Sequence, residues 1–260
     1  ILKMGAECAA QDGQSGVSEQ LHINTDKYKT YDDLVASIRA AGIESIQTMV
    51  CFDFSASNGA LHDTKTKNPY MRVLEILQPV LQEFDDDGEI NAYRFGCSDS
   101  CANRVVPLFG ESDTYKGFEG LMEAYTKAAQ SVTQSGPTTF AHSVQKAIEI
   151  EKQLGGKQLL LCVLITDGGI SDERLDRKWI EEATKYPISF VGVGVGGGDF
   201  GILERFDDKL KGKFDNFQFV NFNEIEKIAL KHERPDLVFA CSLLNELPEH
   251  FTSMKKLGYL

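Results

Sequence analysis

The sequence has no long apolar run, no dense cysteine pattern and no excess of basic side chains. Its longest apolar run, Leu159 to Thr166, is far shorter than the ~20 residues that a membrane-spanning helix needs, and no secretory signal opens it. With 39 acidic against 27 basic side chains, the net charge of −12 repels phosphate backbones and anionic membrane surfaces. We therefore expect neither a membrane span nor a nucleic-acid partner.

The six cysteines are scattered, without a CxxC pair or a zinc spacing. Cys51 and Cys162 lie within apolar strand-like runs, where a small buried thiol is ordinary. Cys97 and Cys101 would close a small loop if they were oxidised, but isolated thiols elsewhere favour a reducing compartment. The cysteine pattern therefore predicts a cytoplasmic protein.

The first residues leave a second location open. If the natural chain starts at Met4, the following glycine and the nearby Cys8 resemble an acylated N-terminus, although Ala10 stands where serine or threonine is usual. In that case we expect peripheral association with the plasma membrane. If not, the same residues are a plain flexible tail.

One domain is expected over residues 29–260, preceded by a flexible lead-in over residues 1–28 that is polar and aperiodic. Strands are predicted at residues 46–54, 90–95, 159–166, 188–195 and 217–222, and helices at 31–41, 69–81, 118–132, 140–154, 172–186 and 235–256, the last bent near Pro248. This alternation predicts an α/β fold of three layers, with a doubly wound, mostly parallel sheet and helices on both faces.

Polar side chains follow two of the predicted strands. One apolar strand leads into Asp53, with Ser55 and Ser57 just after it, and another leads into Asp167. Thr138 lies in a third loop, which precedes a helix. Because ligands gather outside the carboxyl ends of parallel strands, the two carboxylates converge if their strands are neighbours.

Two carboxylates and three hydroxyls are hard oxygen donors, which suit Mg²⁺, Mn²⁺ or Ca²⁺ and not zinc or copper. We therefore predict a divalent cation, Mg²⁺ or in its place Mn²⁺ or Ca²⁺, held by Asp53, Ser55, Ser57, Thr138 and Asp167. With few charged ligands the ion stays partly positive, so an acidic side chain of a protein partner can replace a water in its shell. Serines after a strand are also ordinary turn and cap residues, so each motif is unspecific when it stands alone.

In their order, Asp53-Phe54-Ser55-Ala56-Ser57, Thr138 and Thr166-Asp167-Gly168 are similar to the DxSxS, Thr and TDG elements of the metal-ion-dependent adhesion site of von Willebrand factor A domains. Over roughly residues 30–257 the sequence resembles the copine branch of that superfamily. Residues 31–45 are most similar to the segment before the copine-like domain of plant RING-type ubiquitin ligases. The resemblance implies a protein-interaction module in signalling or ubiquitin-linked scaffolding.

Parts of those families have no counterpart in these 260 residues. They contain neither the RING of the ligases nor the two C2 domains of copines, so we carry over neither ligase activity nor membrane docking. Whether a longer chain contains such domains stays open. Within the resemblance, Ser55 replaces a commoner threonine but keeps the hydroxyl. His142 stands where proline is usual, which leaves the start of its helix open.

Two enzymatic alternatives stay open beside the binding module. A magnesium-dependent phosphotransferase would use Asp53 as its nucleophile, but Ser55 stands where such enzymes need a second carboxylate. The stretch from Gly192 to Gly197 fits the G-x-G-x-x-G fingerprint of a nucleotide-binding enzyme, although it does not follow the first strand of the unit. The five histidines show no catalytic spacing. We therefore predict a binding module that is not an enzyme.

Overall fold

The computed structural model describes residues 28–100 and 103–260. The predicted lead-in, the acylated start at Met4 and Cys101 lie outside the described residues, apart from Tyr28. Cys51, Cys97 and Cys162 are buried thiols. Among the described residues, no helix combines the length and the apolarity that crossing a bilayer requires.

The described chain forms a seven-stranded sheet in the order β3-β2-β1-β5-β6-β7, with β4 also paired to β2. The strands are β1 (Ile46–Asp53), β2 (Glu89–Phe95), β3 (Val106–Pro107), β4 (Thr114–Lys116), β5 (Leu159–Thr166), β6 (Ile188–Gly194) and β7 (Phe217–Asn221). The five long strands pair in parallel, whereas β3 and β4 pair antiparallel to β2. Every residue of β1 and β5 is buried, as a central parallel strand requires.

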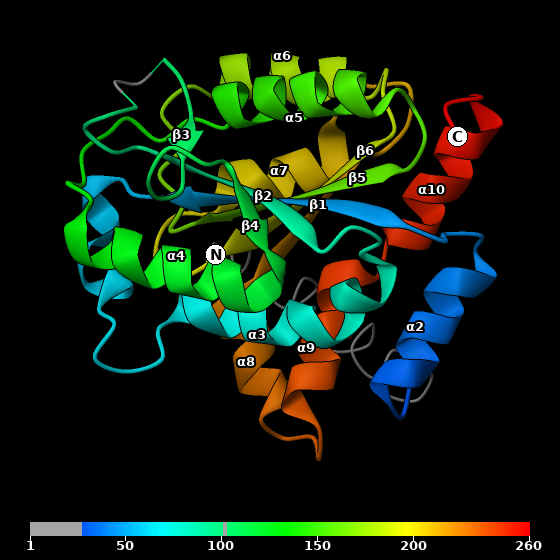
Figure 1. Cartoon of the computed structure of the whole chain (residues 1–260), viewed down its shortest axis with the longest axis horizontal. Coiled ribbons are helices and arrows are strands. Elements are labelled where there is room, and N and C mark those ends of the chain that lie inside the picture. Colours follow the sequence, from blue (N-terminus) through cyan, green and yellow to red (C-terminus); the bar gives the residue numbers. More distant parts are fainter. Residues whose placement is uncertain (1–27, 101–102) are drawn as a thin grey trace, which may run out of the picture.

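Helices cover both faces of this sheet, with α5 and α6 on one side and α3, α4, α8 and α9 on the other (Figure 1). The α-helices are α2 (Tyr31–Ala40), α3 (Pro69–Leu81), α4 (Gly117–Ser131), α5 (Ala141–Leu154), α6 (Glu173–Ala183), α7 (Gly201–Lys209), α8 (Phe222–Ala229), α9 (Pro235–Leu244) and α10 (Leu247–Lys256), and the short 3₁₀ helices are η1 (Ala56–His62) and η2 (Gln82–Phe84). The predicted three-layer, mostly parallel fold is thus confirmed.

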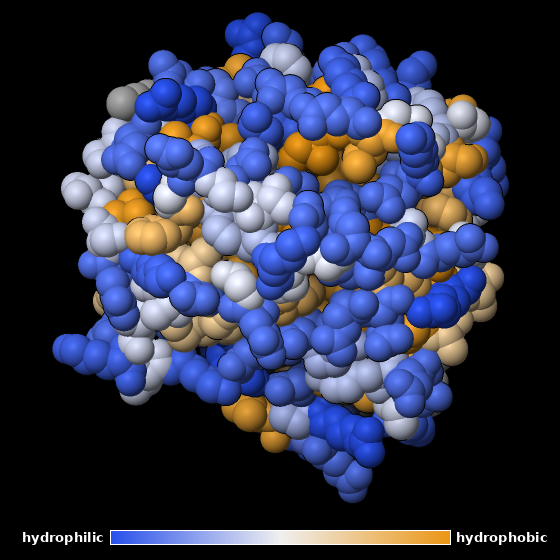
Figure 2. Space-filling view, in the orientation of Figure 1, coloured by the Kyte–Doolittle hydropathy of each residue, from blue (hydrophilic) through white to orange (hydrophobic). Residues whose placement is uncertain are grey.

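Successive residues of β1 feed two separate apolar clusters because side chains alternate across a strand. Val50 and Phe52 belong to the larger cluster, which also contains side chains of α3, α4, α8 and α9. Met49 and Cys51 belong to the other cluster, beneath α5, α6 and α7. The side of the molecule seen in Figure 1 is covered mainly by hydrophilic side chains, with apolar ones in scattered areas (Figure 2).

Local sequence signals explain where several helices begin and end. Thr30 and Asp33 form a capping box at the start of α2, with each side chain accepting a hydrogen bond from the other residue's backbone N–H. Gly155 ends α5 in the left-handed conformation, at φ 70°. Both boundaries agree with the sequence-based expectation.

The C-terminal segment differs from the single bent helix that we predicted. It forms two helices, α9 and α10, separated by Asn245 and Glu246. Pro248 lies in the first turn of α10, where a residue without an N–H leaves no hydrogen bond unmade, so the chain breaks before this proline and not at it. The sequence analysis also missed η1, α7, α8 and the short strands β3 and β4.

Candidate metal site

The five predicted ligands come from three loops at the carboxyl end of the sheet. β1 pairs with β5 on one side and with β2 on the other, so the chain reverses its strand order at β1. Asp53 ends β1, and Asp167 directly follows β5. The two aspartates therefore lie beyond neighbouring strands at a topological switch point, where open α/β sheets place their ligand sites.

Short hydrogen bonds orient the carboxylate of Asp53. One oxygen, Oδ1, accepts from the backbone N–H of Ser55 at 2.8 Å, and Oδ2 accepts from the Thr166 hydroxyl at 2.6 Å. Asp53 is fully buried. The Ser55 hydroxyl lies 3.2 Å from the Ser57 hydroxyl and accepts from the Asn58 amide at 2.9 Å. The serine hydroxyls and the first carboxylate are thus held in one fixed turn.

The loop that carries Thr138 joins this turn through a short ladder of backbone bonds. Ser135 accepts from the N–H of Ala56 at 2.7 Å and donates its own N–H to Gly96 at 3.0 Å. Ser135 therefore lies between the ends of β1 and β2. On the other side, Thr138 donates its N–H to the Ser171 hydroxyl at 3.1 Å and accepts from the Ser171 N–H at 2.9 Å. Thr138 itself is buried.

The carboxylate of Asp167 has an oxygen without a partner. Its Oδ1 is buried and makes no hydrogen bond among the described residues. Burial raises the pKa of Asp167, whereas the Ser57 hydroxyl and the Asn58 amide lower it, so both groups lie beside this carboxylate. Burial also raises the pKa of Asp53, to about 6, and the charge of Asp167 adds to this rise. Two buried carboxylates that repel each other favour a bound cation.

A buried polar network behind Asp53 was not predicted from the sequence. The His62 ring lies with Nε2 2.8 Å from the carbonyl oxygen of Asp53 and Nδ1 2.9 Å from the Tyr125 hydroxyl. Tyr70 donates to the Asn58 side chain, which itself holds Ser55. Burial lowers the pKa of His62 to about 4, so this ring is neutral at neutral pH. No sequence spacing reveals this role, because the partners come from η1, α3 and α4.

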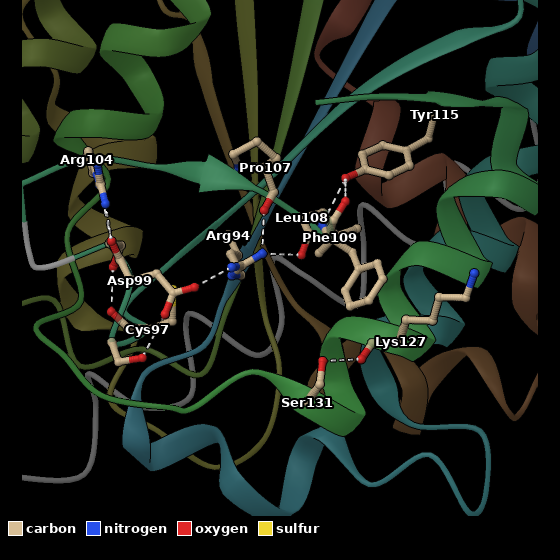
Figure 3. Close-up of polar contacts among 12 residues, drawn as sticks. Arg94, Cys97, Asp99, Arg104, Pro107, Leu108, Phe109, Tyr115, Lys127 and Ser131 are labelled. Carbon is tan, nitrogen blue, oxygen red and sulfur yellow. Dashed lines mark hydrogen bonds and ion pairs between the residues drawn. The ribbon is translucent and has the colours of Figure 1, made fainter. Parts of the chain in front are cut away.

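The loop after β2 is held next to the Ser135 ladder by the buried Arg94. Its guanidinium donates to the carbonyl oxygens of Pro107 at 2.5 Å and Leu108 at 2.6 Å, and pairs with Asp99 at 2.7 Å (Figure 3). The N–H of Ser98, next to Asp99, donates to the carbonyl oxygen of residue 133 at 3.0 Å. Hydrogen bonds therefore also fix the β2 side of the site.

These residues fit a divalent cation with hard oxygen ligands. In the part of the chain that the structure describes, no group of three or more His, Cys, Asp or Glu side chains gathers that could hold a metal. The candidate set has two carboxylates, with hydroxyls from Ser55, Ser57 and Thr138, so it suits Mg²⁺ or Mn²⁺ better than zinc. The buried, unpartnered oxygen of Asp167 supplies a ligand atom that the protein itself leaves unused.

The glycine stretch that suggested a nucleotide-binding enzyme has a packing explanation. A side chain on Gly192 would lie 2.9 Å from Phe217, and one on Gly194 would lie 2.7 Å from Phe200. Both glycines lie in β6, not in a loop after the first strand of the unit. They let two aromatic rings close on the sheet, so the fingerprint needs no phosphate to account for it.

The copine family model matches residues 60–260 of the sequence. The chain belongs to the copine family. It is 34% identical over 253 residues to copine family protein 2 of Caenorhabditis elegans, with 91% of this chain and 3% of that protein aligned. It is also 34% identical over 259 residues to the E3 ubiquitin-protein ligase RGLG5 of Arabidopsis thaliana, with 90% of this chain and 60% of the ligase aligned. The resemblance inferred from the sequence is thus confirmed.

Among solved structures, the chain resembles the manganese-loaded TRAP protein of Plasmodium vivax. The TM-score is 0.48 and the identity 15%, with 75% of this chain and 74% of that chain covered. A likeness of this size supports no conclusion about the function of our chain.

Our prediction that the protein is not an enzyme is wrong for this family. Several of its curated relatives are E3 ubiquitin-protein ligases, which are enzymes. The prediction rested on missing acid, base and RING residues within the given sequence. The chain spans only 60% of the length of RGLG5. The prediction therefore took no account of the residues of such ligases that lie outside the aligned part.

Proposed function

We propose that this copine domain binds one divalent cation between Asp53, Ser55, Ser57, Thr138 and Asp167, and uses it to bind a protein partner. The observation that carries the proposal is the buried Oδ1 of Asp167, which lacks a hydrogen-bond partner among the described residues. Leaving a buried carboxylate oxygen unpaired costs free energy. A cation at this point offsets that cost and the repulsion between the two aspartates.

The partner contributes an acidic side chain in this proposal. The protein supplies at most two carboxylates, and both accept or lie beside hydrogen-bond donors that draw off part of their charge, so the ion keeps partly positive character. Exposure supports an open face, because Ser57 is exposed while Asp53 is buried beneath it. A carboxylate from another molecule can therefore approach from the Ser57 side and complete the shell in place of water.

We further propose a role in ubiquitin-linked scaffolding, in which the metal site captures a protein for modification. Support comes from the relatives named E3 ubiquitin-protein ligases, of which RGLG5 is aligned over 60% of its length. The chain aligns with only part of that ligase, so the activity of the whole ligase is not carried over to it. The contribution proposed for this domain is recognition of the partner.

A peptide-display experiment tests the binding mode. We expect the immobilised chain to select peptides with a central Asp or Glu in Mn²⁺, to release them in EDTA and to rebind them when Mn²⁺ is restored. Thr138→Ala removes one neutral ligand and should weaken binding without unfolding the domain. Peptides in which the acidic residue is changed to Asn or Gln serve as matched controls. Selection that survives EDTA, or equal binding of the amide peptides, would contradict the proposal.

A further inference from the structure

Helix α5 begins just after the candidate ligand Thr138, and its local capping is weak: the hydroxyl of Thr139 accepts from the N–H of Ala141 at 3.3 Å. The N-cap residue is Phe140, whose side chain cannot accept a hydrogen bond. The carboxylate of Asp176, which belongs to α6, takes this place. Its Oδ1 accepts from the N–H of Ala141 at 2.8 Å and from the hydroxyl of Thr139 at 2.5 Å. Helix α6 therefore caps the start of the preceding helix, α5.

This carboxylate lies in an unusual place. Asp176 is fully buried, and no ion pair to a basic side chain is found for it among the described residues. Its second oxygen, Oδ2, is buried without a hydrogen bond. A buried carboxylate is costly, and the positive end of a helix only partly offsets the cost. An apolar residue would fill this position at a lower cost in free energy. We therefore attribute the carboxylate to the hydrogen bonds that its Oδ1 accepts.

A second contact ties the same loop to the same helix. Ser171 exchanges two hydrogen bonds with the backbone of Thr138, at 3.1 and 2.9 Å. The next residue, Asp172, caps α6 by accepting from the N–H of Leu175 at 2.9 Å. Thr138 is thus held by Ser171 directly before α6, and its neighbour Thr139 by Asp176 within α6. A shift of α6 must carry the Thr138 loop with it.

We propose that Asp176 is a positioning residue that locks the Thr138 loop to α6, so that metal binding and the position of α6 are coupled. The inference rests on the proposed metal-binding function. Because coupling between two sites is reciprocal, a metal ion should tighten α6, and a ligand that restrains α6 should raise the metal affinity. The outer surface of α6 then becomes a place from which the metal site can be regulated.

The test is a Mn²⁺ titration of the full chain, by calorimetry, for the wild type and three variants. Asp176→Ala removes both bonds and should lower the Mn²⁺ affinity about tenfold or more, as loss of an outer-shell partner does. Asp176→Asn keeps an acceptor oxygen and should lose less. The control is Ile180→Ala, a buried change on the same helix that touches none of these hydrogen bonds, and it should melt earlier but keep its affinity.

Hydrogen exchange supplies a readout that a purely structural role would not move. In the wild type, Mn²⁺ should slow the exchange of the α6 amides, and in Asp176→Ala it should not. If Asp176→Ala does not fold, Thr139→Ala replaces it, because it removes the hydroxyl donor to Oδ1 and little volume.

Three results would overturn the inference. A wild-type chain that binds no Mn²⁺ overturns the proposed function and this inference together. A wild type that binds Mn²⁺, with unchanged affinity in the variants at Asp176 and Thr139, overturns the inference alone. An affinity loss in Ile180→Ala as large as in Asp176→Ala would trace the effect to general destabilisation and also overturn it.

Discussion

A single methyl group on Gly96 should disturb the candidate site. This glycine follows β2 at φ 69°, and a Cβ there would lie 2.8 Å from the Ser55 nitrogen and 3.0 Å from Oδ1 of Asp53. Both neighbours belong to the turn that carries Asp53, Ser55 and Ser57. They cannot move apart from each other, because they are hydrogen-bonded to each other. Gly96→Ala must therefore push the ligand turn outwards.

Gly110 is a matched control for this change. Its φ of 73° is nearly the same, but a Cβ there meets nothing within 4 Å. Alanine in the left-handed region costs about 1–2 kcal/mol in either place, and the stiffer unfolded chain returns about 0.4–1 kcal/mol. Gly110→Ala should thus lower the free energy of unfolding by about 1 kcal/mol. Gly96→Ala adds overpacking of about 1–3 kcal/mol, and so a total of about 2–4 kcal/mol.

Urea unfolding with and without Mn²⁺ measures both effects. The extra loss in Gly96→Ala should appear beside a Mn²⁺ affinity that falls about tenfold, since sites of this kind need their ligands within about 0.5 Å of the productive geometry. Gly110→Ala should bind Mn²⁺ like the wild type. Equal losses of stability in the two variants, or full Mn²⁺ affinity in Gly96→Ala, would refute the reasoning.

Three further predictions concern other parts of the molecule. Thr166→Val keeps the volume but removes the donor to Asp53, so the free energy of unfolding should fall by about 1.5–3 kcal/mol in urea titrations, and a smaller loss would contradict the role given to this bond. Burial raises the pKa of Glu151 to about 7 from 4.5, so the folded state holds this proton longer than the unfolded state and loses stability as pH rises through that window. Relative to the wild type, Glu151→Gln should therefore gain up to about 3 kcal/mol between about pH 5 and pH 8, and a pH-independent difference would contradict this. Binding of an acidic peptide should hold or slightly improve as salt rises to ~0.15 M, where the screening length is about 8 Å and repulsion by the −12 charge fades, and a collapse with modest salt would indicate surface ion pairs in place of the ion.

The sequence was most informative where the physics is local. Runs of apolar residues located the central strands, because β1 and β5 are buried on both faces and are therefore mostly apolar. Two of the ligand loops followed from the rule that parallel strands end at one edge, and the structure brings Asp53 and Asp167 to neighbouring strand ends. Local signals in the sequence, such as Gly155 at the end of α5, marked helix ends correctly.

Contacts between distant segments escaped the sequence analysis. His62 lies 63 residues from Tyr125, and Thr139 lies 37 residues from Asp176, so no local pattern reveals either pair. His142 left the start of α5 open because it stands where proline is usual. In the structure the helix starts at Ala141, whose N–H donates at 2.8 Å to Asp176 of α6. Short elements such as η1 and β3 are set by tertiary contacts and carry little periodicity of their own.

Calorimetric titration of Mn²⁺ into wild type and Asp167→Ala tests the central claim most directly. Asp167 supplies the buried oxygen that lacks a partner among the described residues. Replacing this side chain by alanine removes a buried charge and breaks no hydrogen bond to that oxygen. The variant should therefore stay folded. We predict one Mn²⁺ per chain for the wild type and no measurable binding for Asp167→Ala. One-to-one binding of equal affinity in both proteins would place the ion elsewhere and contradict the account.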